Sequence, residues 1–313
     1  MGASALTGRA HVLQCSANGR AGNLADHTRI LMHISFGGGG GAVRVTEYLF
    51  IDGAYLRFCY EKVMKDFYGS ADFRNVDFTH VIRGCDAQKV FYYDCIDDMQ
   101  KQGENDLDVE KRVKDQEDFF NTIRSQAGYH VILGSMSGTR PKKARQKQVD
   151  VHLAVDMMNH AVRRNMDRAS LLTGDLDFKP VIEALIDLGI YTRLHYLKRY
   201  TAQELVFSAD LAREITFQIL HGWTKQAFQT AHPIPGGIIG YARDPRTIEL
   251  RRGTFNGNPL ILYGFPHGHP TQDWRCIVAE RYTEEGQSLT VLNGDEALLE
   301  KYFRTMYGEI QWQ

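Results

Sequence analysis

Four aspartates in this 313-residue chain have the residue type and the placement that a divalent-cation site requires. Asp52 ends one short apolar run, Asp175 and Asp177 follow another, and Asp150 opens a stretch with helical periodicity. Carboxylates that gather at one place repel each other, and a bound cation offsets that repulsion. An all-oxygen ligand set suits Mg²⁺ or Mn²⁺ better than zinc. Such an ion would support hydrolysis of a phosphodiester.

A single aspartate in any of these positions is as often a helix cap or a turn residue as a ligand. The hypothesis therefore depends on the four acids lying together at one edge of a sheet. Asp156 is a second-tier candidate, because it lies six residues beyond Asp150, or about 9 Å further along a helix.

Five cations lie immediately before Asp150, with no acid among them. They are Arg140, Lys142, Lys143, Arg145 and Lys147. A solvated loop is the ordinary explanation of such a run. Its position beside the acids favours a second interpretation, in which the cations bind a phosphate backbone with sequence-independent, salt-sensitive affinity.

Short apolar runs that alternate with amphipathic stretches begin at residue 48. Strands are expected at 48–51, 90–93, 130–133, 170–173 and 191–196, and helices at 55–68, 106–126, 149–163, 179–188 and 203–220. In the helix 149–163, the periodicity predicts a buried face of Val151, Ala154, Val155, Met158 and Val162. The alternation predicts right-handed βαβ units and an α/β fold, a doubly wound parallel sheet of about five strands. Ligands bind such sheets at the carboxyl ends of the strands, where Asp52 and Asp175 are expected to meet.

The chain is expected to have three parts. Residues 1–43 lack periodicity and contain five consecutive glycines, which predicts a flexible tail. Residues 44–222 hold the α/β domain. Residues 223–313 form a small β-rich accessory domain, in which a linker with Pro235 and Gly236 precedes the strands. Five strands are expected in that domain, near 238–242, 247–252, 259–264, 274–281 and 288–292, with a terminal helix over 295–306.

The composition excludes several classes of protein. With 37 Lys and Arg against 38 Asp and Glu, the chain is no uniformly basic nucleic-acid coat, although a local basic patch is compatible with this balance. Five cysteines without a C-x-x-C pair argue against a disulfide scaffold and a zinc ribbon. Neither a membrane-spanning run nor a signal peptide is found, so a cytoplasmic location without membrane association is expected.

Four motifs resemble the NYN domain, in the LabA/DUF88 branch of the PIN-like nucleases. They are LFIDG at 49–53, VFYYD at 90–94, KQVDVHLAVD at 147–156 and TGDLDFKP at 173–180. The family patterns are roughly I-D-G-x-N, Y-Y-D, K-G-V-D-V-x-L-x-x-D and S-G-D-x-D-F-x-P. The resemblance spans about residues 47–220 and implies a PIN-like fold, binding of Mg²⁺ or Mn²⁺, and endonucleolytic action on RNA, more often single-stranded. Motif matching gives the acidic roles to Asp52, Asp150, Asp175 and Asp177.

Two departures from these patterns occur, and the first of them supports an alternative hypothesis. Tyr55 stands where the family usually has Asn, and Gln148 replaces a Gly. A catalytically weak NYN module that acts as an RNA-binding or regulatory interaction protein is therefore the second hypothesis. Tyr55 and Tyr92 could stack on bases, although aromatic residues near strand ends more often belong to the core. The β-rich domain could mediate a homodimer or recruit a protein partner.

Overall fold

The computed structural model describes residues 45–134, 142–240, 244–268 and 272–313, and the side chains of 142–147 also lie outside the description. These described residues belong to one compact unit. Within the described ranges, no helix is both long and apolar enough to span a bilayer. Cys59 and Cys85 are buried free thiols.

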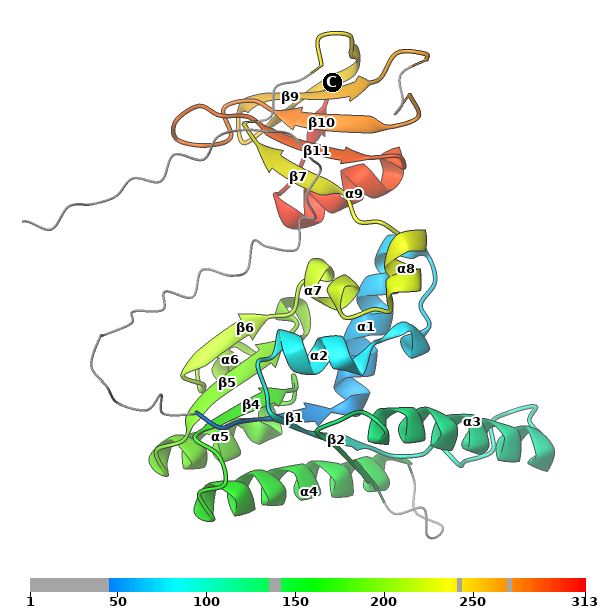
Figure 1. Ribbon diagram of the computed structural model, residues 1–313, viewed down its shortest axis with the longest axis vertical. Helices are drawn as coiled ribbons and strands as arrows, with labels where there is room; N and C mark the ends of the chain where they lie inside the picture. Colours follow the sequence, from blue (N-terminus) through cyan, green and yellow to red (C-terminus); the bar gives the residue numbers. More distant parts are fainter. Residues whose placement is uncertain (1–44, 135–141, 241–243, 269–271) are drawn as a thin grey trace, which may run out of the picture. The chain divides into compact units, whose positions relative to one another are not determined.

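A six-stranded parallel sheet forms the first half of the fold (Figure 1). Its strands are β1 (Glu47–Asp52), β2 (Lys89–Asp94), β3 (Tyr129–Leu133), β4 (Arg168–Leu172), β5 (Tyr191–Tyr196) and β6 (Leu211–Glu214). They lie in the order β3-β2-β1-β4-β5-β6. The chain extends the sheet first from β1 towards β3 and then, on the other side of β1, from β4 towards β6. The point between β1 and β4 is therefore the topological switch, where such sheets bind their ligands.

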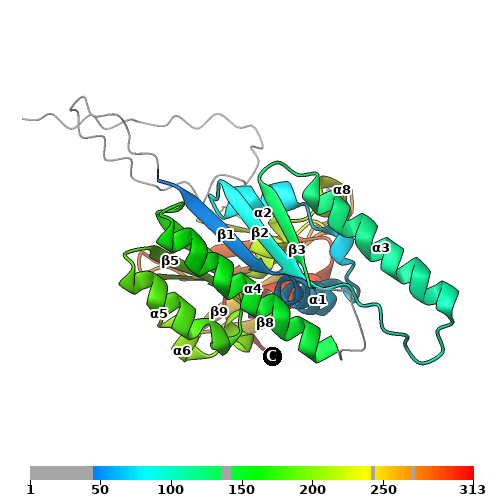
Figure 2. The ribbon, with the colours of Figure 1, turned by 90° about the horizontal axis from the view of Figure 1, so that it is seen from below.

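Helices cover both faces of this sheet, because successive side chains of a buried strand point to opposite sides. In β1, Leu49 and Ile51 pack into one core, and Tyr48 and Phe50 into the other. The first core is covered by α1 (Gly53–Tyr68), α2 (Phe78–Gly84), α3 (Asp106–Arg124) and α7 (Phe217–Gly222). The second is covered by α4 (Lys142–Val162), α5 (Lys179–Asp187) and α6 (Gln203–Val206). Figure 2, seen from below, shows α4 in front of the sheet.

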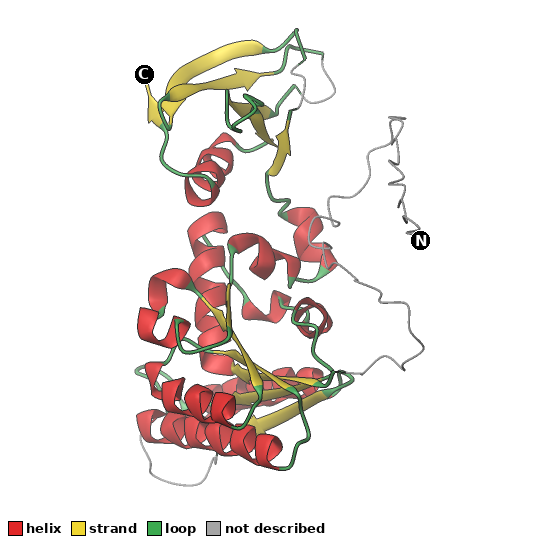
Figure 3. Cartoon of the chain, turned by 90° about the vertical axis from the view of Figure 1, so that its left-hand side faces the viewer, coloured by secondary structure: helices red, strands yellow, loops and turns green. Residues whose placement is uncertain are grey.

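A second, antiparallel sheet follows the short helix α8 (Gln226–Ala231), and both sheets are drawn in yellow in Figure 3. Its strands are β7 (Gly236–Ile239), β8 (Ile248–Phe255), β9 (Asn258–Gly264), β10 (Arg275–Ala279), β11 (Leu289–Asn293) and β12 (Gln311–Trp312), in the order β12-β8-β9-β10-β11-β7. The helix α9 (Glu296–Met306) buries Leu299 and Phe303. The expected β-rich fold with a terminal helix is confirmed, although Gly236, expected in the linker, begins β7.

Two expectations for the α/β part are wrong in detail. The predicted helix 203–220 is interrupted by β6, in which Leu211 pairs with Arg193 of β5. The carboxylate of Asp210 accepts hydrogen bonds from the backbone N–H and the hydroxyl of Thr192, at 2.7 and 2.9 Å. This pairing with the sheet overrides the local helical pattern.

The helix expected over 149–163 begins at Lys142, and its buried face is rotated from the expected one, of which Ala154 and Met158 still pack against the core. Its core residues follow an i, i+4 spacing: Val149, Leu153, Met157 and Ala161. Val151, Val155 and Val162, which were expected in the core, are 59%, 50% and 67% exposed. The helix carries apolar residues on two sides, and periodicity alone did not identify the side that faces the sheet.

Candidate active site

Asp52 connects the two central strands at the switch point. It ends β1 and caps α1, where its Oδ1 accepts a hydrogen bond from the backbone N–H of Tyr55 at 3.0 Å. Its Oδ2 accepts one from Thr173 Oγ1, directly after β4, at 3.2 Å. Burial raises the pKa of Asp52 to about 6; the Tyr55 hydrogen bond opposes this rise, and the charges of Asp150 and Asp94 add to it.

Asp150 comes from α4, on the face of the sheet opposite to α1. It lies in the third turn of α4 rather than at the start of the helix, and its side chain is half-buried. Burial, and after it the negative charges of Asp175 and Asp177, together raise its pKa to about 6. The carboxylate therefore lies within electrostatic reach of the loop that follows β4.

Asp175 and Asp177 are exposed in that loop. Asp175 caps a 3₁₀ turn (Leu176–Phe178), and its Oδ1 accepts a hydrogen bond from the N–H of Asp177 at 3.0 Å. The N–H of Asp175 donates to Thr173 Oγ1 at 3.2 Å. Because the same hydroxyl donates to Asp52, Thr173 links the acid of β1 to the acidic loop of β4. This bridging role was missed in the sequence.

The four acids form an electrostatically connected group, because Asp150 acts on Asp52 and is acted on by Asp175 and Asp177. In the part of the chain that the structure describes, no three His, Cys, Asp or Glu side chains are close enough to form a ready-made metal site. By chemistry and charge, however, the carboxylates match the oxygen ligands of Mg²⁺ and Mn²⁺. The four carboxylates therefore fit a divalent cation by their chemistry, and binding of the cation would draw them closer together.

A fifth acid, Asp94, ends the VFYYD motif and is not among the predicted site residues. It ends β2, is buried, and forms an ion pair with Arg57 of α1. It also accepts hydrogen bonds from the Tyr92 hydroxyl at 3.2 Å and the Cys95 N–H at 2.8 Å. Its charge contributes to the raised pKa of Asp52. The sequence could have identified Asp94, because it ends an apolar strand, as Asp52 does.

The other candidates are Asp156 and the basic residues 140–147. Asp156 accepts a hydrogen bond from the Tyr93 hydroxyl at 2.9 Å. Arg140 lies outside the described residues. Lys142, Lys143, Arg145 and Lys147 belong to the first turns of α4, and their side chains are outside the description. The predicted phosphate-binding role of this run stays a prediction.

Tyr55, at the position where the family usually has Asn, contacts both the loop after β4 and the segment after β5. Its hydroxyl accepts a hydrogen bond from the backbone N–H of Leu197 at 2.8 Å and lies 3.0 Å from Thr201 Oγ1. Its ring lies against Gly174, the residue before Asp175. Tyr92 is fully buried. Tyr55 therefore positions the acidic loop against the segment after β5, and Tyr92 belongs to the core.

This contact predicts a large effect of Gly174→Ala. A Cβ atom there would lie 2.4 Å from Cε2 of Tyr55, which must move together with the acidic loop. We expect a loss of about 1–3 kcal/mol in the free energy of unfolding, measured in urea. Gly222→Ala is the control, because a Cβ at that position meets nothing within 4 Å. Equal stability of the two variants would show that the Tyr55 contact does not hold the loop.

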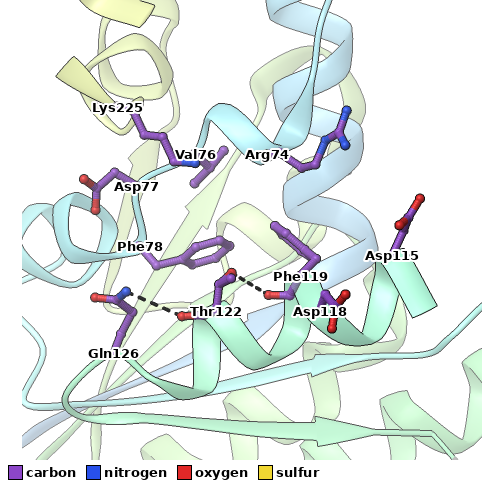
Figure 4. Close-up of a pocket in the computed structure, with 10 residues that line it drawn as sticks. All are labelled: Arg74, Val76, Asp77, Phe78, Asp115, Asp118, Phe119, Thr122, Gln126 and Lys225. Atoms are coloured by element: carbon purple, nitrogen blue, oxygen red, sulfur yellow. Dashed lines mark hydrogen bonds between the residues drawn. The ribbon is translucent and has the colours of Figure 1, made fainter. Parts of the chain in front are cut away.

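A cavity of about 510 Å³ lies elsewhere in the α/β part (Figure 4). Phe78 and Phe119 provide its apolar wall, and none of the four predicted acids lines it. Three carboxylates and two cations complete the lining together with uncharged residues, and one of the cations, Arg74, is paired with Asp72. This balance of charge does not favour a phosphodiester, so we assign the cavity no part in the chemistry.

Comparison with known proteins identifies the family. The model of the NYN domain matches residues 48–216, more than half of the chain. The chain belongs to the NYN domain family. All four acids of the candidate site lie inside the match, and the predicted resemblance to the NYN domain is confirmed. An NYN domain is a PIN-like module of nuclease type.

Among solved structures, the chain is similar to a crystal structure of a protein of unknown function from Vibrio parahaemolyticus. The two are 18% identical, with a TM-score of 0.42, over 56% of this chain and 96% of the other. The comparison with curated proteins gave no match.

Proposed function

We propose that this NYN protein is a divalent-metal-dependent ribonuclease that hydrolyses phosphodiester bonds at Asp52, Asp150, Asp175 and Asp177. The observation that supports the proposal most is the mutual repulsion of these acids at the switch point of the sheet. It raises the pKa of Asp52 and of Asp150 on top of the effect of burial, each to about 6. Maintaining such a group of like charges is costly unless a cation binds there.

The surrounding residues would orient this group. Mg²⁺ or Mn²⁺ held by the four carboxylates would polarise the phosphodiester and neutralise charge that develops during hydrolysis. Thr173 and the Tyr55 N–H fix both oxygens of Asp52, so that its carboxylate is oriented before substrate arrives. Arg57 neutralises the neighbouring Asp94. The basic residues 140–147 precede Asp150 along the chain, and we assign them to the RNA backbone.

We expect the purified protein to cleave single-stranded RNA in Mn²⁺ or Mg²⁺ and to lose this activity completely in excess EDTA. Addition of Mn²⁺ beyond the chelator should restore the activity. Product lengths on a denaturing gel report the reaction, and internal products identify an endonuclease. Cleavage that persists in excess chelator would contradict the proposed mechanism.

A catalytically weak NYN module that binds RNA is the second candidate. It is favoured by the exposure of Asp175 and Asp177 and by the lack, within the described ranges, of three ligands close enough to hold a metal. RNA binding without cleavage at any Mn²⁺ concentration would decide for this candidate.

A further inference from the structure

Two exposed aromatic side chains lie beside the candidate active site. Phe58 lies on α1, and Tyr200 lies in the turn that follows β5; each is 37% exposed. Their rings meet edge to face, with centroids 5.0 Å apart. We call Phe58 and Tyr200 the aromatic surface. It differs from the core side of α1, where Leu56 and Met64 are fully buried.

The aromatic surface is linked to the acidic loop through Tyr55. The rings of Tyr55 and Phe58 are stacked, with centroids 6.4 Å apart. The Tyr55 ring also contacts Gly174, the residue before Asp175. Tyr200 follows β5 at the same carboxyl edge of the sheet that carries Asp52 and Asp175. A strand of nucleic acid at the acids would therefore have the aromatic surface as a close neighbour.

Cations accompany the aromatic surface. Lys198 and Arg199 are exposed in the same turn as Tyr200, and the guanidinium of Arg199 lies 5.8 Å from the centre of the Tyr200 ring. Exposed rings beside cations are the combination by which proteins bind single strands, with bases stacked on rings and phosphates near positive charge. The charge and the chemistry match an RNA segment with unpaired bases. A duplex would not match, because its bases stack on one another.

We propose that the aromatic surface binds unpaired bases of the RNA strand whose backbone lies at the acidic group, with Lys198 and Arg199 contacting the adjacent phosphates. The assignment of the strand to cleavage rests on the proposed function. The base-binding surface itself does not require cleavage. It would make the protein selective for single-stranded substrates.

The test measures binding apart from cleavage. The full chain carrying Asp175→Asn is titrated in EDTA against fluorescently labelled single-stranded RNA and against the corresponding duplex. Adding Phe58→Ala and Tyr200→Ala should weaken single-strand binding by about tenfold or more, since stacking contributes about 1–3 kcal/mol per base. Tyr200→Trp should retain the affinity, and Arg199→Ala should reduce its dependence on salt concentration.

The opposite end of β5 provides a matched control. Tyr191 is 41% exposed, and the guanidinium of Arg168 lies 5.4 Å from the centre of its ring. Tyr191→Ala removes a similar aromatic–arginine pair far along the strand from the acids, and should leave binding unchanged. Thermal melts verify that each variant is folded.

The outcomes separate the two proposals. If the wild-type protein never cleaves but loss of the aromatic surface selectively weakens single-strand binding, the nuclease assignment is wrong and the surface is supported. Variants that bind single-stranded RNA as tightly as their parent would overturn the inference and leave the surface to another kind of partner. Equal losses for single strand and duplex, or no single-strand binding by the parent, would also overturn it.

Discussion

Replacing Asp150 by Asn is expected to lower the rate of RNA cleavage by about 10²-fold or more and to raise the thermal stability of the protein at pH 7. The loss of activity follows from removing a charge that would help to hold the cation and stabilise the transition state, for which single electrostatic groups contribute about 10²–10³ in rate. The gain in stability follows first from removing a half-buried charge and second from removing its repulsion by Asp175 and Asp177. A substitution that damages the fold would lower both quantities.

The sign of the stability change follows from the pKa of Asp150. This pKa is about 6 in the folded protein against 3.8 for an unperturbed carboxyl, so folding disfavours the charged form. The folded state then loses stability as the pH rises from about 4 through 6 and has its full penalty at pH 7. Because Asp150 is only half-buried, we discount the penalty to about 1 kcal/mol, or about 2–4 °C in melting temperature for a chain of this size.

Melting curves with and without Mn²⁺ complete this test. The cation should stabilise the wild-type protein, because a ligand that binds only the folded state raises its stability. The gain should be much smaller in the Asp150→Asn variant. Asp187→Asn is the control, since Asp187 is exposed at the end of α5 and should affect neither activity nor the response to Mn²⁺. Normal cleavage by Asp150→Asn would remove this residue from the proposed site.

The strands of the α/β part were predictable because each is a short apolar run between amphipathic segments. The expected strand 191–196 matches β5 in both bounds, and the end of β1 at Asp52 follows from the change of residue type at that position. The meeting of Asp52 with the loop after β4 follows from topology alone. A parallel sheet places the ends of neighbouring strands at one edge, whatever their separation in the sequence.

The interactions that orient these acids were not predictable from periodicity. Thr173 appears in the sequence as the last residue of a strand, and only the folded chain brings its hydroxyl to 3.2 Å from Asp52. Tyr55 was identified as a departure from the family pattern, yet its bonds to Leu197 and Thr201 cross more than 140 residues. β6 was not predicted for the same reason: it is stabilised by pairing with β5 and not by residues next to it in the sequence.

A buried ion pair at the other edge of the sheet leads to the second large expected effect. Glu47 begins β1 and Arg193 lies in β5; both side chains are at most 7% exposed, and Nη1 of Arg193 lies 2.6 Å from Oε1 of Glu47. Ser170 of β4, between the two strands, donates to the same oxygen at 2.6 Å. Three adjacent strands thus share one carboxylate.

Replacing either charged partner alone, by Glu47→Gln or Arg193→Met, is expected to cost about 3–5 kcal/mol in the free energy of unfolding, because it leaves the other partner charged, buried and unpaired. Urea unfolding monitored by circular dichroism measures the loss as a lower midpoint with an unchanged slope. Arg252→Met is the control, because its pair with Glu249 is exposed and should contribute less than about 1 kcal/mol. If the single variants unfold like the control, the pair contributes little to stability.

The double variant Glu47→Met, Arg193→Met separates the stability that the ion pair itself contributes from the cost of leaving one charge unpaired. With both charges removed, the hydroxyl of Ser170 is left without its acceptor, at a cost of about 1–3 kcal/mol. The long 3.4 Å hydrogen bond from Arg193 Nη1 to the Cys85 carbonyl is also lost, as it is in the Arg193→Met variant. The double variant should therefore be more stable than either single variant, whereas two independent contributions would make it the least stable of the three. Glu47 and Asp52 lie at opposite ends of β1, so the loss of the ion pair should leave the acidic edge in place. The folded fraction of the double variant should therefore still cleave RNA. This would show that the sheet's stability and its acidic edge are built from separate residues.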